Sequence, residues 1–193
     1  MDATGWDERY REKPLVWSAG PNQFVAEDLA HLEPGTALDV ACGEGRNAVW
    51  LAEQGWDVTG VDFSEVALEK AAGMARDRGV EVEWIRADVT AWAPDRTFDL
   101  ILIAYVHFPG PAWTDLVARA STRVAPGGHL YLVGHDVVTV GVSGPPDPEL
   151  LWDPESAASA VGGLTTVRAE RRVRLLDEGQ EAVDTVLVAR NEK

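Results

Sequence analysis

Short apolar runs alternate with longer amphipathic stretches from Thr36 onward. The runs predict strands and the stretches predict helices, because a buried strand is short while a helix repeats its apolar positions about every 3.6 residues. This alternation is typical of a parallel sheet covered by helices on both faces and joined by right-handed crossovers. The predicted elements are strands at 36–41, 57–62, 81–86, 98–104 and 129–134, with helices at 45–54, 64–78 and 112–123.

The two ends of the chain depart from this alternation. Two short helices are predicted before the first strand, at 4–13 and 21–32, and we expect this leader, residues 1–34, to fold over the ligand as a lid. Residues 35–193 are expected to form the core of a single domain, 1–193. Near the other end we predict a turn-rich loop at 140–148 that covers the site, a short helix at 154–160, and an antiparallel hairpin of 166–175 and 181–190 joined by Asp177-Glu-Gly179.

A glycine-rich loop follows the first predicted strand, in Asp39-Val-Ala-Cys-Gly-Glu-Gly45. Glycine reaches positive φ at little cost, so this loop can bring its backbone against a ligand. The spacing Gly43-x-Gly45-x-x-Ala48 also matches a dinucleotide fingerprint, in which a pyrophosphate lies on the helix N-terminus. Asp39 argues for a different ligand, because an acid beside the loop repels a pyrophosphate and suits an ammonium group.

A second acid, Asp62, ends the next predicted strand. It lies about 20 residues past the glycines, where nucleotide-binding βαβ units bind ribose hydroxyls. The inferred ligand therefore carries both a cation and a ribose. S-adenosylmethionine (SAM) has an ammonium group, a sulfonium and a ribose diol, whereas NAD fits less well.

Two segments resemble the motifs of one enzyme class. Leu38-Asp-Val-Ala-Cys-Gly-Glu-Gly45 resembles motif I of the class I SAM-dependent methyltransferases, and Gly60-Val-Asp-Phe-Ser64 resembles the acidic motif that follows it. The resemblance spans most of the chain. It implies a Rossmann-like α/β fold: a seven-stranded, mostly parallel sheet with an antiparallel C-terminal hairpin and helices on both faces.

Within that class, Gly45-Arg-Asn47 and the aromatic leader Trp6-Asp-Glu-Arg-Tyr10 are similar to the tellurite-resistance (TehB-like) and thiopurine methyltransferase branch. The resemblance implies SAM as the cofactor and S-adenosylhomocysteine as its product. It also implies that Asp88 lies against the adenine amino group. The expected cofactor-binding residues are Trp6, Tyr10, Trp17, Asp39, Ala41, Cys42, Gly43, Gly45, Arg46, Asn47, Asp62, Phe63, Ser64, Ala87, Asp88, Val89, Ala104 and Tyr105.

Three residues are candidates for catalysis. Methyl transfer mainly requires alignment of donor and nucleophile, but a neutral hydroxyl acceptor also needs a general base. His107 follows the fourth of the main strands and His135 the fifth, so both are expected at the carboxyl edge near the transferred methyl; for each, a loop histidine bonded to the backbone is an equally good interpretation. Arg46 opens the helix after the glycine loop, where it faces either an anionic substrate, the SAM carboxylate, or a neighbouring acid such as Asp39 or Glu44.

The aromatic and sulfur-bearing residues have simpler alternatives. Trp6 and Tyr10 share one helix face, and with Trp17 they either stack on the cofactor or substrate or clamp the leader by packing. Cys42 is interpreted as a packing residue, since no base for a nucleophilic thiol is visible. The four histidines and one cysteine show no ligand spacing, so no metal site is expected.

Composition narrows the range of partners. The 193 residues are 46% hydrophobic and 25% charged, with a formal net charge of −15. That charge repels a phosphate backbone, so a nucleic-acid substrate is not expected. One cysteine, no basic start before an apolar segment, and no apolar run approaching the roughly 20 residues of a membrane span predict a cytoplasmic protein without a membrane anchor.

The sequence thus predicts a SAM-dependent methyltransferase, monomeric or homodimeric, that acts on a small-molecule nucleophile. A soft sulfur, selenium or tellurium acceptor is the option that the narrower resemblance suggests. Two alternatives stay open. One is a non-catalytic SAM-binding module that kept the donor pocket, and the less favoured one is an NAD-dependent oxidoreductase, for which the chain lacks a Tyr-x-x-x-Lys pair.

Overall fold

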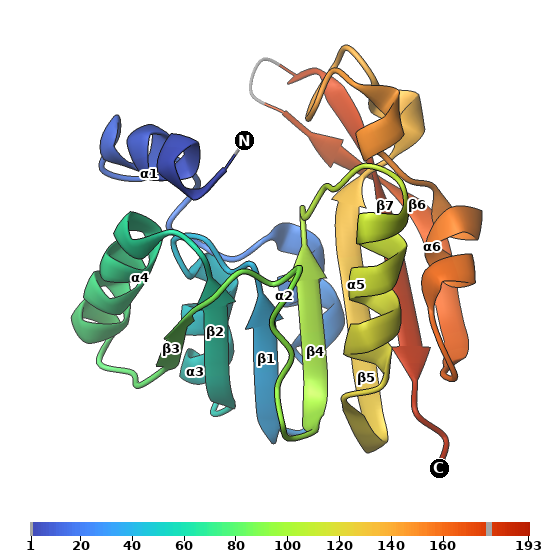
Figure 1. Ribbon diagram of the computed structural model, residues 1–193, viewed down its shortest axis with the longest axis horizontal. Helices are drawn as coiled ribbons and strands as arrows, with labels where there is room; N and C mark the ends of the chain where they lie inside the picture. The colour runs from blue at the N-terminus through green and yellow to red at the C-terminus, as the bar shows by residue number, and fades with distance from the viewer. Residues whose placement is uncertain (1, 177–178) are drawn as a thin grey trace. The chain divides into compact units, whose positions relative to one another are not determined.

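The computed structural model describes residues 2–176 and 179–193, which group into two compact units that meet in sequence at Trp92 and Ala93 (Figure 1). Asp177 and Glu178 of the predicted hairpin turn lie outside the described residues. The first unit contains the leader helices α1 (Ala3–Arg11) and α2 (Gln23–Leu29), followed by β1 (Thr36–Val40), α3 (Arg46–Glu53), β2 (Asp57–Asp62), α4 (Glu65–Arg78) and β3 (Glu83–Arg86).

The strands of the first unit pair in parallel, β1 with β2 and β2 with β3. Their carboxyl ends therefore share one edge of the sheet, where Asp39 lies opposite Gly60 and Asp62 opposite Arg86. Local signals explain the helix between the last two strands. The Ser64 side chain caps the first turn of α4 by accepting from the Ala67 N–H, and Gly79 ends the helix in a left-handed conformation.

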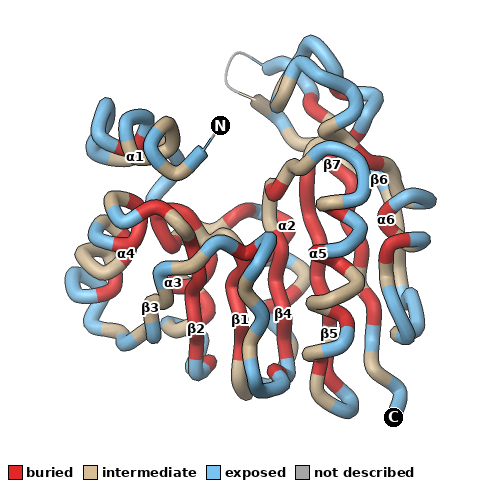
Figure 2. Tube along the Cα trace, in the orientation of Figure 1, coloured by how far each residue is buried: buried red, intermediate tan, exposed pale blue. Residues whose placement is uncertain are grey.

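The second unit contains β4 (Phe98–Ala104), α5 (Pro111–Ser121), β5 (Val124–His135), the 3-10 turns η1 (Val137–Thr139) and η2 (Pro148–Leu150), α6 (Pro154–Ala160), β6 (Thr165–Leu175) and β7 (Glu181–Arg190). β4 and β5 are parallel, whereas β7 runs antiparallel to both β5 and β6. The apolar side chains of β4, from Leu100 to Ile103, are completely buried, and Figure 2 shows the same for most of the strand interiors.

The strand order is β3-β2-β1 in the first unit and β4-β5-β7-β6 in the second, and the described strands form a seven-stranded mixed sheet. The expected fold class is therefore confirmed: α/β, mostly parallel, with an antiparallel C-terminal hairpin. The expectation of a single domain stays a prediction.

One strand differs from the sequence-based expectation. β5 begins at Val124 rather than at 129, so the predicted breaker Pro126-Gly-Gly128 lies inside the strand. A register shift in the pairing with β4, between Phe98 and Leu100, absorbs it. A side chain at Gly128 would approach the Asp99 carbonyl oxygen to 2.8 Å, so glycine permits this close contact rather than a turn.

Candidate cofactor and acceptor sites

The loop after β1 holds three residues in the left-handed region: Ala41 at φ 54°, Gly43 at 54° and Gly45 at 77°. Glycine adopts this region freely, but Ala41 does not, and such a residue costs about 1–3 kcal/mol and persists only where its surroundings enforce it. Here the Cys42 N–H donates to the Val61 carbonyl at 3.0 Å, which ties the loop to the neighbouring strand. Gly45 precedes the first residue of α3 and makes no side-chain cap hydrogen bond to it.

Asp62 supports this loop from the end of β2. Its carboxylate accepts hydrogen bonds from the Gly43 N–H and the Ser64 N–H, each at 2.8 Å, and its exposed fraction is 5%. Burial raises the pKa of Asp62 and the backbone hydrogen bonds oppose that rise. Each carboxylate oxygen keeps a further lone pair, so Asp62 can still accept from a ribose hydroxyl.

Asp39 lies at the end of β1 and is 1% exposed. Within residues 2–176 and 179–193, its Oδ2 atom is buried and has no hydrogen-bond partner. Burial raises the pKa of Asp39 to about 7, although a hydrogen bond from Ala48 and the charge of Arg46 both work against the increase. An unpaired carboxylate oxygen inside a protein is costly, so this atom is suited to bind a cation. The buried acids and the glycine loop together fit the ammonium group and ribose of SAM.

The leader packs directly on the glycine loop. Trp6 and Tyr10 of α1 stack with ring centroids 5.5 Å apart, and a side chain at Gly43 would approach the Tyr10 hydroxyl to 2.8 Å. Burial raises the pKa of Tyr10, and the nearby charge of Asp62 adds to the effect. The Arg9 guanidinium lies over Trp6 at 5.3 Å and over Trp17 at 5.5 Å from the ring centroids, so a side chain of the protein already occupies one face of each indole.

Glu44, inside the glycine loop, anchors the rest of the leader. Its buried carboxylate accepts from the backbone N–H of Val16 at 2.9 Å and of Trp17 at 3.1 Å. Lys70 of α4 donates to Glu44 at 3.0 Å, to the Lys13 carbonyl at 2.7 Å, and also to the Tyr10 carbonyl. The cofactor loop and the leader are therefore held by one shared set of charged hydrogen bonds.

The remaining predicted cofactor residues divide by their contacts. Asn47 Oδ1 accepts from the Asn22 N–H at 2.9 Å, and Arg46 donates to the Ser18 hydroxyl at 3.1 Å, so both reach the leader. Asp88 is exposed and accepts from Thr90 of its own loop. Ala87 donates its N–H to the Asp62 carbonyl at 3.0 Å. Of the others, Val89 is buried, and Cys42, Phe63 and Ala104 are partly buried.

Cys42 and Ser64, two of these residues, have surroundings that give each a structural role. Burial raises the pKa of the Cys42 thiol well above its usual range, so this cysteine is a poor nucleophile. Ser64 both caps α4 and donates from its hydroxyl to Asp7 of the leader.

The described residues contain no group of three or more metal-ligating side chains.

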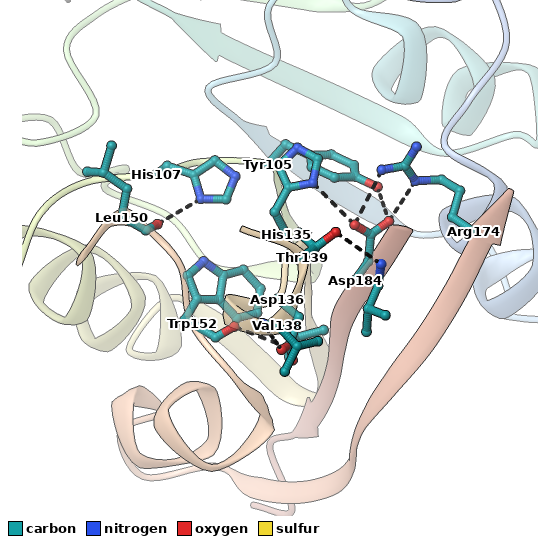
Figure 3. Close-up of polar contacts among 12 residues, drawn as sticks. Tyr105, His107, His135, Asp136, Val138, Thr139, Leu150, Trp152, Arg174 and Asp184 are labelled. Atoms are coloured by element: carbon teal, nitrogen blue, oxygen red, sulfur yellow. Dashed lines mark hydrogen bonds and ion pairs between the residues drawn. The ribbon is translucent and has the colours of Figure 1, made fainter. Parts of the chain in front are cut away.

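The second unit contains a separate polar cluster at the carboxyl ends of β4 and β5 (Figure 3). At its centre is Asp184 of β7, which accepts from the Tyr105 hydroxyl at 2.6 Å and from Arg174 Nε at 2.8 Å. His135 Nδ1 lies 3.4 Å from the other carboxylate oxygen. Burial alone would raise the pKa of Asp184, but the contact with His135 and the hydrogen bonds from Arg174 and Tyr105 lower it below the ordinary value.

His107 and His135 lie together at the carboxyl ends of β4 and β5. Their rings stack at 5.4 Å between centroids, with an angle of 15° between planes. His107 Nδ1 lies 3.0 Å from the Leu150 carbonyl, which can only accept, so we place the proton on Nδ1. Burial lowers the pKa of His107 to about 4, and the neighbouring His135 adds to this. Its Nε2 is buried and has no partner among the described residues.

Tyr105 and the turn-rich loop complete the surroundings of His135. Tyr105 has φ 55°, an uncommon value for a bulky residue, and its ring lies 4.8 Å from that of His135. Gly144 of the loop also lies against His135, because a side chain there would approach His135 Cδ2 to 2.4 Å. The predicted loop at 140–148 therefore does contact one of the candidate catalytic residues.

Sequence reasoning missed Asp184 and Arg174. One signal for Asp184 was available: it is a charged residue inside the apolar strand Glu181–Arg190, and buried charges need partners. No comparable signal existed for Arg174, because β6 alternates charged and apolar residues along its whole length.

A sequence model described as "Methyltransferase domain" matches residues 37–128. A ubiquinone biosynthesis O-methyltransferase of Alkalilimnicola ehrlichii is 36% identical over 131 residues, which is 65% of this chain and 52% of that protein. Thiocyanate methyltransferase 1 of Arabidopsis thaliana is 31% identical over 157 residues, covering 76% of this chain and 67% of the relative. The chain thus spans about half the length of the first of these relatives.

Among solved structures, the N-methyltransferase NodS of Bradyrhizobium japonicum, in complex with S-adenosylhomocysteine, superposes with a TM-score of 0.77. Its sequence is 20% identical, and the similarity covers 100% of both chains, so it shows a shared fold. In residues 2–176 and 179–193, no helix is long and apolar enough to cross a membrane.

Proposed function

We propose, since the chain belongs to the class I SAM-dependent methyltransferase family, that it transfers a methyl group from SAM to a small-molecule nucleophile. SAM is the cofactor of this family, and when bound it supplies an electrophilic methyl carbon. The observation that carries the proposal is the buried, unpartnered Oδ2 of Asp39 beside the glycine loop. A pocket built for a pyrophosphate would not place a buried carboxylate there.

The residues of the first unit would divide the binding of SAM between them. Asp39 would accept from the ammonium group and Asp62 from the ribose hydroxyls, while the glycine loop would approach the ligand with its backbone. The leader, held by Glu44 and Lys70, would act as the lid and exclude water. Arg46 and Asn47 would contribute indirectly, since both bond to the leader.

For the acceptor, we propose a soft nucleophile, in keeping with the TehB-like and thiopurine methyltransferase resemblance. The similarity to a protein named as a thiocyanate methyltransferase supports this choice, because thiocyanate is a soft sulfur nucleophile. The net charge of −15 argues against nucleic acid as the substrate. We propose a cytoplasmic protein that is monomeric or homodimeric, because its single cysteine fits a reducing compartment.

The first test is a titration of the purified protein with S-adenosylhomocysteine by calorimetry, followed by an acceptor screen with methyl-labelled SAM. The screen offers thiols, thiopurines, halides, thiocyanate, selenite, tellurite and simple phenols, and label is counted in both headspace and organic extract. Binding together with labelled product supports the proposal. Binding without label on any acceptor supports the SAM-binding module instead, and absence of binding contradicts both.

A further inference from the structure

We infer that His135, oriented by Asp184, is the general base that takes a proton from the acceptor, so that the acceptor is a neutral small molecule with an S–H or O–H group. This inference rests on the proposed methyl transfer and narrows it. Among soft nucleophiles it selects thiols over proton-free anions such as thiocyanate or halides, and it adds phenols to the candidates.

Asp184 has the position of an orienting residue. It lies directly opposite His135 in the β5–β7 pairing, and its Oδ1 is 3.4 Å from His135 Nδ1, a buried atom with no hydrogen-bond partner among the described residues, so the contact is an electrostatic one. A carboxylate at this nitrogen favours the tautomer with the proton on Nδ1 and leaves Nε2 with a free lone pair. Asp184 therefore acts as a positioning residue, and Nε2 of His135 is the atom that would meet the acceptor.

The carboxylate is itself held in place. Tyr105 and Arg174 Nε donate to the same oxygen, Oδ2, at 2.6 and 2.8 Å, and Arg174 Nη2 donates at 3.4 Å to Oδ1, the oxygen that faces His135. Because Asp184 is completely buried, removing these donors would leave a buried charge without compensation. Arg174 balances the charge of Asp184, so the pair offers the acceptor no net positive charge that would attract an anion.

His107 adds a hydrogen-bond acceptor beside the base. Its Nδ1 is committed to the Leu150 carbonyl, so the buried Nε2 presents only a lone pair. Positive charges on two stacked imidazoles repel each other, so the two rings are not protonated at the same time. His107 therefore remains neutral when His135 takes a proton. In Figure 3, His135 lies between His107 and Asp184, with Tyr105 beside it. Among the described residues, the titratable groups that contact His135 include His107, Tyr105 and Asp184, and Arg174 reaches it through Asp184.

Acceptors with an S–H or O–H group match this set of lone pairs. Their proton passes to His135 Nε2, and the electron pair of the broken bond stays on the sulfur or oxygen. That atom forms the new bond to the methyl carbon, and the pair of the former carbon–sulfur bond remains on the sulfur of the donor. The proton on His135, balanced by Asp184, then leaves to solvent.

The inference is tested with the His135→Gln, Asp184→Asn and Tyr105→Phe variants, and with His31→Gln, an exposed histidine, as the matched control. Transfer is measured against pH with a series of thiols and phenols and with thiocyanate as the proton-free acceptor. General base catalysis contributes about 10²–10⁴-fold, so we expect His135→Gln to lower kcat by that factor for thiols and phenols. Asp184→Asn lowers it less. Thiocyanate transfer, if present, and the control stay unchanged.

A second readout needs neither cofactor nor acceptor. Nitrogen-15 NMR of the ligand-free protein should show His135 with its proton on Nδ1, and Tyr105→Phe, which keeps the ring, should shift that resonance. The Nε2–H tautomer in the wild type, or equal losses of kcat for thiols and thiocyanate in His135→Gln, would overturn the inference.

S-adenosylhomocysteine calorimetry on every variant separates the two proposals. Failure of the wild type to bind overturns the proposed function, whereas normal binding with an unaffected His135→Gln overturns only this inference.

Discussion

Oδ2 of Asp62 accepts a hydrogen bond from the Gly43 N–H at 2.8 Å, which joins the acid at the end of β2 to the glycine loop at the end of β1. The same carboxylate binds the Ser64 N–H at the start of α4. One side chain therefore fixes both walls of the candidate cofactor site before any ligand is present.

Replacing Asp62 with Ala should weaken binding of S-adenosylhomocysteine by roughly ten- to a hundred-fold or more, because charged hydrogen bonds contribute about 1.5–3 kcal/mol each. Calorimetry measures the affinity. Asp57→Asn, at the exposed amino end of the same strand, is the matched control and should bind like the wild type. Equal affinities for Asp62→Ala and the wild type would refute the assignment of Asp62 to the ribose.

Binding of S-adenosylhomocysteine should strengthen as the pH rises through about 7. The pKa of Asp39 is raised to about 7 in the ligand-free protein, and an ammonium group binds the ionised carboxylate. Between pH 6 and pH 8 the ionised fraction increases about tenfold, so the affinity should rise by up to about that factor. Asp39→Asn should bind weakly at both values and show little of this dependence.

The raised pKa of Asp39 has the opposite pH dependence for the stability of the ligand-free protein. Because the folded state holds the Asp39 proton more tightly than the unfolded chain does, this residue's contribution to the free energy of unfolding falls as the pH rises from about 4 to about 7. Chemical denaturation of the wild type and Asp39→Asn across this range measures the difference. A smaller loss in the Asn variant is expected, and an identical loss would contradict the buried, protonated state.

Lys70→Met should loosen the leader. The ammonium of Lys70 bonds to Glu44 and to the Lys13 carbonyl, and the Glu44 carboxylate in turn holds the Val16 and Trp17 amides. Hydrogen exchange of those two amides should become about 10–100-fold faster, since the loss of such bonds costs on the order of 1.5–3 kcal/mol. Arg76→Met, on the same helix and exposed, is the control. Unchanged exchange in Lys70→Met would show that the leader is held by other contacts.

Gly144→Ala should displace His135, whereas Gly141→Ala should not. Both glycines have positive φ, 86° and 81°, so the backbone strain of the two substitutions is comparable. Only at Gly144 would the new Cβ approach the imidazole, to 2.4 Å, while nothing lies within 4 Å at Gly141. The imidazole resonances of His135 report the displacement. Identical spectra for the two variants would contradict the close approach of the loop.

The sequence was sufficient for the fold because its apolar runs and glycines act locally. Strands such as Phe98–Ala104 are buried on both faces and stand out as continuous apolar runs, and Ser64 and Gly79 mark the ends of α4. It failed at Pro126-Gly-Gly128, where breaker residues are absorbed by a bulge. The outcome there depends on the contact with Asp99, which is set by the partner strand and not by the local sequence.

The cofactor-binding role of Asp39, the glycines and Asp62 stays a prediction. The positions of His107 and His135 relative to the parallel strands predicted only that both lie at the carboxyl edge, and the stacking of their rings was not predicted. The role of Asp184 was not accessible, because it depends on the register that places it opposite His135 in the hairpin. Periodicity identifies which residues share a face of a strand, but it does not fix the pairing between distant strands.

Glu44 carries a kinetic consequence. It belongs to the loop proposed to bind the cofactor, and its carboxylate accepts the hydrogen bonds that attach the leader to that loop. With the leader acting as the proposed lid, the product S-adenosylhomocysteine would leave only after these contacts open, and the rate of that opening would set an upper limit on turnover. We expect a first turnover faster than the following ones, with product release as the slow step.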